Sequence, residues 1–268
     1  MKTIGWLIKE HWTNAYLMLR LSLYDLKTMH VSNRLGLLWF ILTPAMQIGI
    51  YWAVFGLGIR GGAPVEGTPF IIWLLCGLIP WFYISGGIIQ GTRSVYVKLP
   101  MVSKMKFPLS VIPTTVVLTQ LYTHVALLLI LVTILAFTQG VTILALTGML
   151  FYTILLTAFL LALALITSTL ATLARDVQLV VQSFTRMAFY FTPIMWTMNE
   201  RTPDTLKNVM QLNPLSYFIE GYRESLLTDD LSQIATKSSL YVGACIVVLF
   251  VVGAWMHMKA RTSFVDQM

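Results

Sequence analysis

Charged residues are scarce in this chain, and their scarcity decides its class. Only 11% of the 268 residues are Asp, Glu, Lys or Arg, whereas soluble domains carry about 25%. Hydrophobic residues make up 57% of the chain, and its mean hydropathy is +0.77. This composition excludes an ordinary soluble domain and predicts a polytopic membrane protein that forms one domain over residues 1–268.

Catalytic and metal-binding motifs are also missing. The two cysteines, Cys76 and Cys245, each lie alone in an apolar segment, so redox or zinc-site spacing is absent and no disulfide is expected. None of the motifs G-x-S-x-G, H-E-x-x-H and G-x-x-x-x-G-K-[ST] occurs, which excludes a serine hydrolase, a zincin and an ATPase. We therefore expect a non-catalytic chain that itself binds no metal and no cofactor.

Long apolar segments, in contrast, are abundant. Each is close to the ~20 residues that cross ~30 Å of hydrocarbon. We expect six spans, at about 36–58, 70–92, 110–137, 142–173, 178–198 and 236–258. The predicted fold class is therefore an all-α membrane protein, with six transmembrane helices within residues 36–258 and a cytoplasmic tail at 259–268.

Residues 1–35 are expected to form an amphipathic helix on the membrane surface. Lys2, Lys9, Arg20 and Lys27 gather on one helical face, and apolar residues occupy the other positions. Such a helix lies in the interface plane of the cytoplasmic leaflet, where anionic lipids attract its cations.

The distribution of cations predicts the orientation of the spans. If the N-terminus lies in the cytoplasm, the cytoplasmic segments hold twelve Lys and Arg residues and the outer loops hold four. The positive-inside rule then places both termini in the cytoplasm. Membrane orientation also explains the net charge of +7, because no nucleic-acid-binding motif accompanies it.

The loop 93–113 is a basic island that contains four cations and no acid. Pro100 suits the first turn of a helix, and Phe107 is pushed out of helical geometry because Pro108 follows it. We expect about two turns of helix along the membrane surface, able to fill a groove on another protein. The alternative is a solvated loop that only sets orientation.

A polar stripe runs along the expected fifth span, where Gln178, Gln182, Arg186 and Tyr190 recur every four residues. An Arg within a span costs ~2.5–3.5 kcal/mol on insertion scales, so Arg186 should face protein or a wet cavity. One hypothesis is that it lines a path for an anionic lipid headgroup. The other is that it snorkels to the surface or bonds a neighbouring helix.

The outer segment 193–230 contains apolar pieces that are too short to span a bilayer, interrupted at Pro193 and at Asn213 with Pro214. They predict re-entrant half-helices, which persist at membrane depth only when protein or a cavity surrounds them. A plain amphipathic surface helix is the alternative.

Four runs of residues carry a resemblance to a known family. They resemble the permease subunit of ABC-2 type polysaccharide exporters, and they are residues 20–60, the run VSKMKFPLSVIP, residues 168–196 and residues 212–227. The resemblance covers essentially the whole chain. It implies a homodimer of six-span permeases in the cell membrane, paired with two copies of a separate ATPase that binds ATP and Mg.

The same resemblance implies the substrate, an undecaprenyl-diphosphate-linked anionic polymer. Wall teichoic acid is the polymer expected first, because the chain most resembles teichoic-acid translocation permeases. O-antigen or another lipid-linked polysaccharide is the alternative. An intramembrane lipid-modifying enzyme is a more distant hypothesis, since only Arg175 and Asp176 offer paired charge near an interface.

Three groups of site residues follow from these arguments. By similarity to the family's coupling helix, the segment 98–108 and the N-terminal helix are expected to contact the ATPase through Asp25, Arg34, Lys98, Lys104, Met105, Lys106 and Phe107. The first and fifth spans are expected to form the gate and substrate path, with Trp39, Phe40, Arg175, Gln178, Gln182, Arg186 and Tyr190. The outer re-entrant region is represented by Pro193, Asn213, Pro214, Glu220 and Arg223.

Overall fold

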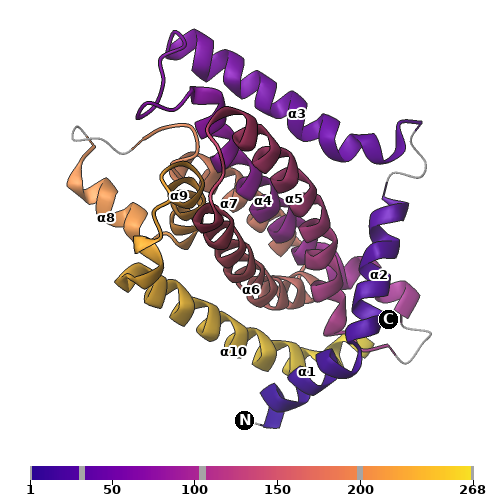
Figure 1. Cartoon of the computed structure of the whole chain (residues 1–268). Helices are drawn as coiled ribbons and strands as arrows, with labels where there is room; N and C mark the ends of the chain where they lie inside the picture. Colours follow the sequence, from indigo (N-terminus) through magenta and orange to yellow (C-terminus); the bar gives the residue numbers. More distant parts are fainter. Residues whose placement is uncertain (1, 30–33, 103–106, 198–201, 267–268) are drawn as a thin grey trace.

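The computed structural model describes residues 2–29, 34–102, 107–197 and 202–266, and these ranges are almost entirely helical (Figure 1). No strand occurs in them apart from one isolated bridge between Val65 and Thr68. The all-α prediction is therefore confirmed for the described part of the chain.

Five helices in the described ranges are long and apolar enough to cross a membrane. They are α3 (Trp39–Tyr51) continued by the π-helix η2 (Trp52–Ile59), α4 (Phe70–Val102), α5 (Val111–Thr138), α6 (Ile143–Leu173) and α10 (Lys237–Asp266). The chain is thus a membrane protein, but the count of six spans is not confirmed.

The expected fifth span, 178–198, is instead the 16-residue helix α7 (Asp176–Phe191). At 1.5 Å per residue it is ~24 Å long, shorter than the ~30 Å hydrocarbon layer. It ends early because Thr192, which precedes Pro193, adopts extended backbone geometry with φ −86° and ψ 137°. The predicted end at residue 198 was therefore wrong.

Helix α4 occupies the centre of the bundle, where it packs against α5, α6, α7 and α9 (Figure 1). Its glycines allow this close packing. A Cβ atom at Gly87 would lie 2.9 Å from Cδ1 of Leu160, and one at Gly91 would lie 2.9 Å from Cβ of Ala164. The G-x-x-x-G of α4 is therefore used for packing against α6 within the chain.

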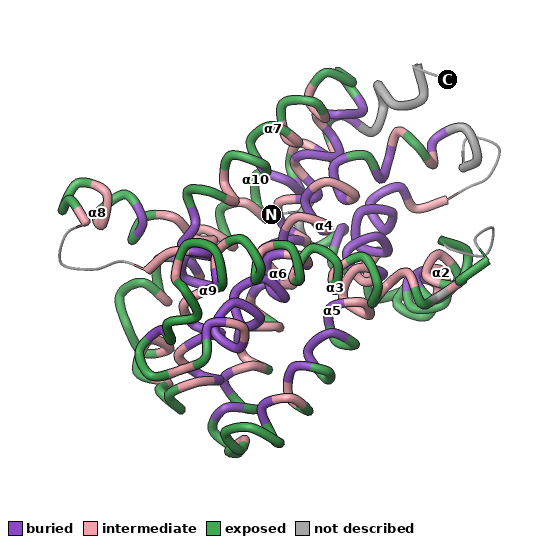
Figure 2. Tube along the Cα trace, turned by 90° about the horizontal axis from the view of Figure 1, so that it is seen from above, coloured by how far each residue is buried: buried purple, intermediate pink, exposed green. Residues whose placement is uncertain are grey.

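Helix α3 has the opposite environment. Only 6% of its spanning part is buried within the chain, compared with 72% for α4. Its exposed side chains are apolar, including Ile41, Met46 and Ile50, and Figure 2 shows the contrast in burial between the two helices. This apolar surface must therefore face lipid or another polypeptide.

The N-terminal segment forms two helices, α1 (Lys2–Thr13) and α2 (Ala15–Thr28), separated at Asn14. They pack against α10 and α5, respectively. Leu7 and Met18 are buried, whereas Arg20 and Lys27 are exposed. The segment thus has the expected amphipathic chemistry, but it is broken into two pieces.

The basic island does not contain the expected separate helix that starts at Pro100, because α4 continues without interruption to Val102. The apolar residues Val95 and Leu99 explain the continuation. They lie one turn apart and are buried in a small cluster with Leu109, Ile112 and Ala260. Packing of this face therefore stabilises the extra turns, and residues 107–108 are non-helical.

Two helices lie between α7 and α10, namely α8 (Asp204–Leu212) and α9 (Pro214–Leu227). Asn213 caps α9, because its side-chain oxygen accepts a hydrogen bond of 3.0 Å from the N–H of Leu215. Pro214 occupies the first turn, where a missing N–H is harmless. Helix α9 packs against α6 and α4, so it is an interior helix rather than a surface one.

The long helices run between two ends of the molecule (Figure 1). We call the end that carries α1, α2 and the C-terminal turns of α4 and α10 the basal end. The end that carries η2, α8 and α9 is called the distal end. Both described termini of the chain lie at the basal end.

Candidate functional site

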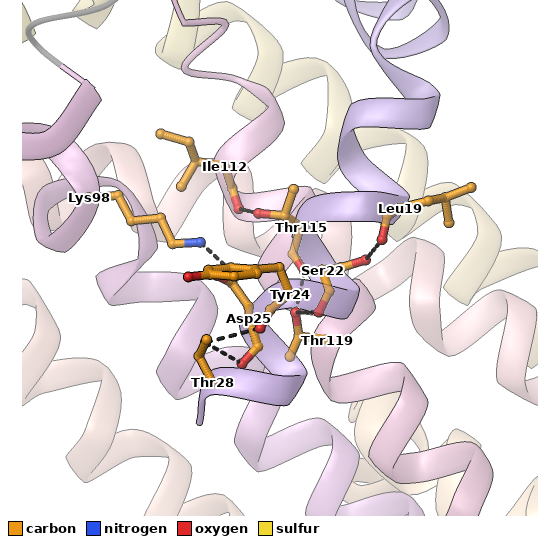
Figure 3. A network of polar contacts seen from close by, with 9 residues as sticks. All are labelled: Leu19, Ser22, Tyr24, Asp25, Thr28, Lys98, Ile112, Thr115 and Thr119. Carbon is orange, nitrogen blue, oxygen red and sulfur yellow. Dashed lines mark hydrogen bonds and ion pairs between the residues drawn. The ribbon is translucent and has the colours of Figure 1, made fainter. Parts of the chain in front are cut away.

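Polar contacts at the basal end attach the N-terminal helices to the bundle, and we call this set the basal junction. Its residues are Glu10, His11, Ser22, Asp25, Lys98, Ser110, Thr114 and Thr119. Figure 3 shows the part of the junction around Ser22, Asp25, Lys98 and Thr119. The hydroxyl of Ser110 donates to the carboxylate of Glu10. Thr119 Oγ1 donates to the carbonyl oxygen of Ser22 at 3.2 Å. These bonds attach both α1 and α2 to the first half of α5.

His11 provides a further link between α1 and α5. Its Nδ1 lies 2.9 Å from the carbonyl oxygen of Leu7, which only accepts, so Nδ1 carries the proton. In the neutral ring, Nε2 is then the acceptor for the hydroxyl of Thr114, at 2.9 Å. The tautomer of His11 is therefore determined by its two partners.

The ion pair between Lys98 Nζ and Asp25 Oδ2 joins α2 directly to the last turns of α4. The two side chains are only 19% and 22% exposed, so solvent screens them less than it screens a surface pair. Both residues were predicted separately as ATPase contacts, and the structure brings them together.

The other predicted coupling residues are placed differently. Lys104, Met105 and Lys106 lie outside the described residues, and Arg34 is exposed shortly before η1 (Gly36–Leu38). Phe107 was expected to fill a groove on a partner. It is half-buried and packs against the Val95 and Leu99 cluster of its own chain.

At the distal end, Arg223 of α9 holds the chain that leaves α7. Its Nη1 donates to the carbonyl oxygen of Pro193, and its Nη2 donates to that of Ile194 at 2.6 Å. The guanidinium carbon also lies 3.5 Å from the centroid of the Trp73 ring, a cation–π contact. A Cβ atom at Gly77 would lie 2.4 Å from Nη2, so this glycine makes room for the guanidinium.

The remaining predicted distal residues belong to the same cluster. Asn213 Nδ2 donates to Thr192 Oγ1 at 3.4 Å, and Pro214 begins α9. Glu220 lines a cavity of about 370 Å³ together with Arg223 and Trp196. Burial raises the pKa of Glu220 to about 7, Arg223 opposes the increase and Glu224 adds to it. The structure therefore gathers all five distal residues, although this placement does not assign them a role.

The polar stripe of α7 does not point into the interior of the chain. Gln178 and Gln182 are half-buried, whereas Arg186 and Tyr190 are exposed. In the described part of the chain, Arg186 has no ion pair or hydrogen bond from its side chain. Arg175, which precedes α7, is also exposed. These residues thus remain candidates for a surface that meets something outside this chain.

Trp39 and Phe40 begin α3 and line a cavity between α3, α4 and α5. That cavity also contains Gln90, Arg93 and Gln120, which sequence patterns did not single out as path residues. Gln90 and Gln120 are polar residues inside otherwise apolar segments, and this was the signal that could have identified them.

Comparison with known proteins decides the family. The model of the ABC-2 type transporter family matches residues 19–227. The chain belongs to this family. The match extends from α2 to the last residue of α9, so it contains both the Asp25–Lys98 pair and the Arg223 cluster.

Three relatives of this ABC-2 protein are described as O-antigen export system permease protein RfbA. The protein from Myxococcus xanthus is 28% identical over 219 residues, which cover 81% of this chain and 82% of the relative. A protein from Klebsiella pneumoniae is 25% identical over 244 residues, covering 90% and 91%. A second from the same organism is 26% identical over 243 residues, with the same coverage.

Proposed function

We propose that this chain is the permease subunit of an ABC exporter that moves a lipid-linked polysaccharide of the O-antigen type across the cell membrane. The observation that carries the proposal is the similarity to three O-antigen export permeases over 81% to 90% of the chain. These relatives favour the O-antigen alternative over wall teichoic acid, which was expected first.

Energy for transport comes, in this proposal, from a separate ATPase, because the sequence lacks the G-x-x-x-x-G-K-[ST] motif that binds nucleotide phosphates. The ATPase contacts the basal end, which is cytoplasmic by the positive-inside rule. The Asp25–Lys98 pair then lies between the helices that meet the ATPase and the central helix α4. Movement of the ATPase is transmitted to α4 and α5 through the basal junction.

The permease acts as a homodimer in this proposal. Helices α3 and α7 both expose large apolar side chains, including Ile41 and Met46 on α3 and Phe184 and Met187 on α7. The polar stripe of α7 lies on the same helix, so a second copy packed there would border a polar path. We also propose that α7 and the buried residues 192–195 after it together make the sixth crossing of the membrane.

The experiment that tests this function uses the chain co-expressed and purified with its cognate ATPase. The complex is reconstituted into liposomes that contain a fluorescent polyprenyl-diphosphate-linked polysaccharide. We expect ATP-dependent movement of the O-antigen type substrate, and none with an ATPase variant that cannot hydrolyse ATP. Hydrolysis without movement of any polysaccharide would overturn the proposal, and movement of teichoic acid alone would restore the first expectation.

A further inference from the structure

A cavity of about 440 Å³ lies between α3, α4 and α5 of the chain, within the range of ~300–1,000 Å³ that is typical of small-molecule sites. Arg93 marks one limit of it on α4, and Phe82 marks the other. These residues are eleven positions apart, so the cavity extends ~16 Å along the helix axis. It therefore reaches from the basal end to about the middle of the bundle.

One side of this cavity is a cluster of hydrogen-bond donors. Gln90 and Arg93 are three residues apart and share a face of α4, and Gln120 reaches the cavity from α5. Among the described residues, none of these three side chains is hydrogen-bonded or ion-paired to another. Gly86 accommodates Gln120, because a Cβ atom there would lie 2.8 Å from its Oε1. The donors are thus positioned and available.

The chemistry of these donors suits a phosphate group. A guanidinium presents several N–H donors in a fixed fork that matches phosphate oxygens, and amide groups add uncharged donors. No Asp or Glu lines the cavity. An anion in the cavity therefore meets one positive charge and no negative charge.

The other side of the cavity is aromatic. Trp39 and Phe40 contribute from α3, and Phe82 and Tyr83 contribute from α4. A flat aromatic ring provides an apolar surface against which the face of a sugar ring packs. The hydroxyl groups at the edge of the sugar then stay free to form hydrogen bonds. The combination of phosphate donors with aromatic walls fits a sugar attached to a phosphate.

The inner end of the cavity is rigid. His124 stacks on Tyr83 with ring centroids 4.7 Å apart, and its Nε2 lies 3.0 Å from the hydroxyl oxygen of Tyr222. That hydroxyl in turn lies 2.7 Å from Thr153 Oγ1. A ligand therefore meets a wall whose side chains are already fixed by four helices.

Helix α3, which forms the outer wall, is bound far more loosely. Only 6% of its spanning part is buried within the chain. A polyprenyl chain attached to the ligand can therefore pass beside α3 into lipid while the polar head of the ligand occupies the cavity.

We infer that this cavity binds the diphosphate and the first sugar of the exported lipid, with Arg93, Gln90 and Gln120 on the diphosphate and Trp39 beside the sugar. The inference rests on the proposed function, since it names the place where that substrate enters the permease. Arg186, expected from the sequence to receive the diphosphate, lies on the exposed face of α7 instead. The shared chemistry, a sugar-linked diphosphate, also occurs in soluble nucleotide sugars.

The test measures binding to the complete permease–ATPase complex in nanodiscs without ATP. The probes are a polyprenyl-diphosphate disaccharide with a photoreactive group and, in a second arm, a soluble nucleoside-diphosphate sugar. We expect Arg93→Gln to weaken binding of the lipid probe tenfold or more and Arg93→Lys to weaken it less. Arg60→Gln is the matched control, because Arg60 does not line the cavity, and it should bind the lipid probe as the wild type does. Photolabelling should modify the peptide that contains residues 39–47.

Other outcomes overturn the inference. Wild-type binding by both Arg93→Gln and Gln120→Leu, or labelling confined to α7, shows that the headgroup lies elsewhere. If Arg93→Gln fails to assemble with the ATPase, Gln120→Leu and Trp39→Ala take its place, and unchanged binding by both overturns the assignment. Binding of the soluble probe alone identifies a nucleotide-sugar site instead.

The inference and the proposed function can fail separately. Unchanged O-antigen transport by Arg93→Gln rejects this cavity and leaves the function standing. A second combination has the opposite meaning. If the wild-type complex moves only teichoic acid and Arg93→Gln loses binding of the lipid probe, the cavity is supported and the proposed polymer is rejected.

Discussion

Lys98, near the end of α4, is ion-paired with Asp25 of α2, 73 residues earlier in the chain (Figure 3). The pair joins the N-terminal helices to the helix at the centre of the bundle. If the ATPase binds at the basal end, as proposed above, this contact lies between the ATPase and the helices that must move. Its role is therefore best tested by separating coupling from stability.

Neutralising either partner should lower the amount of substrate moved per ATP hydrolysed. We expect Asp25→Asn and Lys98→Gln to reduce this ratio several-fold, while stability falls by only ~1 kcal/mol because both side chains are partly solvated. The exchange Asp25→Lys with Lys98→Asp should restore part of the coupling. Transport and ATPase rates in the same liposomes measure the ratio.

A matched control is the pair between Lys207 and Asp204 on α8, whose nitrogen and oxygen are 3.5 Å apart and whose Asp204 is 94% exposed. Asp204→Asn should leave both rates unchanged. Equal effects from the two pairs would mean that Asp25–Lys98 has no special part in coupling.

Arg223 should be essential to the stability of the distal end. Arg223→Lys removes the planar guanidinium, whose two nitrogens donate hydrogen bonds to the carbonyl oxygens of Pro193 and Ile194. It also removes the contact of the guanidinium with the Trp73 ring. We expect a loss of ~2–4 kcal/mol, because buried carbonyl groups are left without donors. Gly77→Ala should have a similar effect, since its Cβ would occupy the place of Nη2.

Thermal unfolding of the purified complex measures both substitutions. Arg60, whose guanidinium lies 5.2 Å from the centroid of the Phe70 ring, offers a comparison with another distal arginine. Arg60→Lys should cost much less than Arg223→Lys. A wild-type melting temperature for Arg223→Lys would show that the carbonyl groups find other donors.

Glu220 gives the distal end a dependence on pH. Burial raises its pKa from 4.5 to about 7, so the folded protein holds this proton more tightly than the unfolded chain. The contribution of Glu220 to stability is then greatest below pH ~4.5 and decreases as the pH rises toward about 7. In this window, the melting temperature of Glu220→Gln should change less with pH than that of the wild type. An identical pH dependence for the variant and the wild type would exclude Glu220 as the cause.

The sequence predicts helix positions well where local signals are strong. The span expected at 142–173 is α6, from 143 to 173, and Thr142 caps it by accepting a 3.0 Å bond from the N–H of Ala145. Predictions failed where tertiary packing decides. Helix α4 continues into the basic island as far as Val102, because Val95 and Leu99 pack in an apolar cluster with Leu109, Ile112 and Ala260, which periodicity alone does not reveal.

The candidate sites show the same contrast between what local sequence signals predict and what tertiary packing decides. Trp39, Phe40, Asp25 and Lys98 could be selected from the sequence, but neither the ion pair nor the cavity could be assembled from it, because both join segments far apart in the chain. Arg93 was interpreted only as a cation that sets orientation. Its place beside Gln120 depends on how α4 and α5 pack, and Gly86 is the residue that permits this approach.

The polar stripe of α7 leads to the last prediction. Arg186 and Tyr190 are exposed in the single chain, and an unpaired Arg is costly next to lipid. If a second copy covers α7, Arg186 borders the path along which the diphosphate travels after it leaves the cavity. Charge is then the property that matters, so Arg186→Lys should keep most of the transport and Arg186→Gln should lose most of it.

Export rate, assembly with the ATPase and binding of the lipid probe must be measured together for these variants. We expect Arg186→Gln to assemble normally and to bind the probe normally, yet to transport at least tenfold more slowly, because the barrier rises after binding. Gln178→Leu, on the same stripe but half-buried, should have a smaller effect because it removes no charge. Wild-type export by Arg186→Gln would mean that the path does not pass this side chain, whereas failure of every substitution to assemble would make Arg186 a structural residue of the interface.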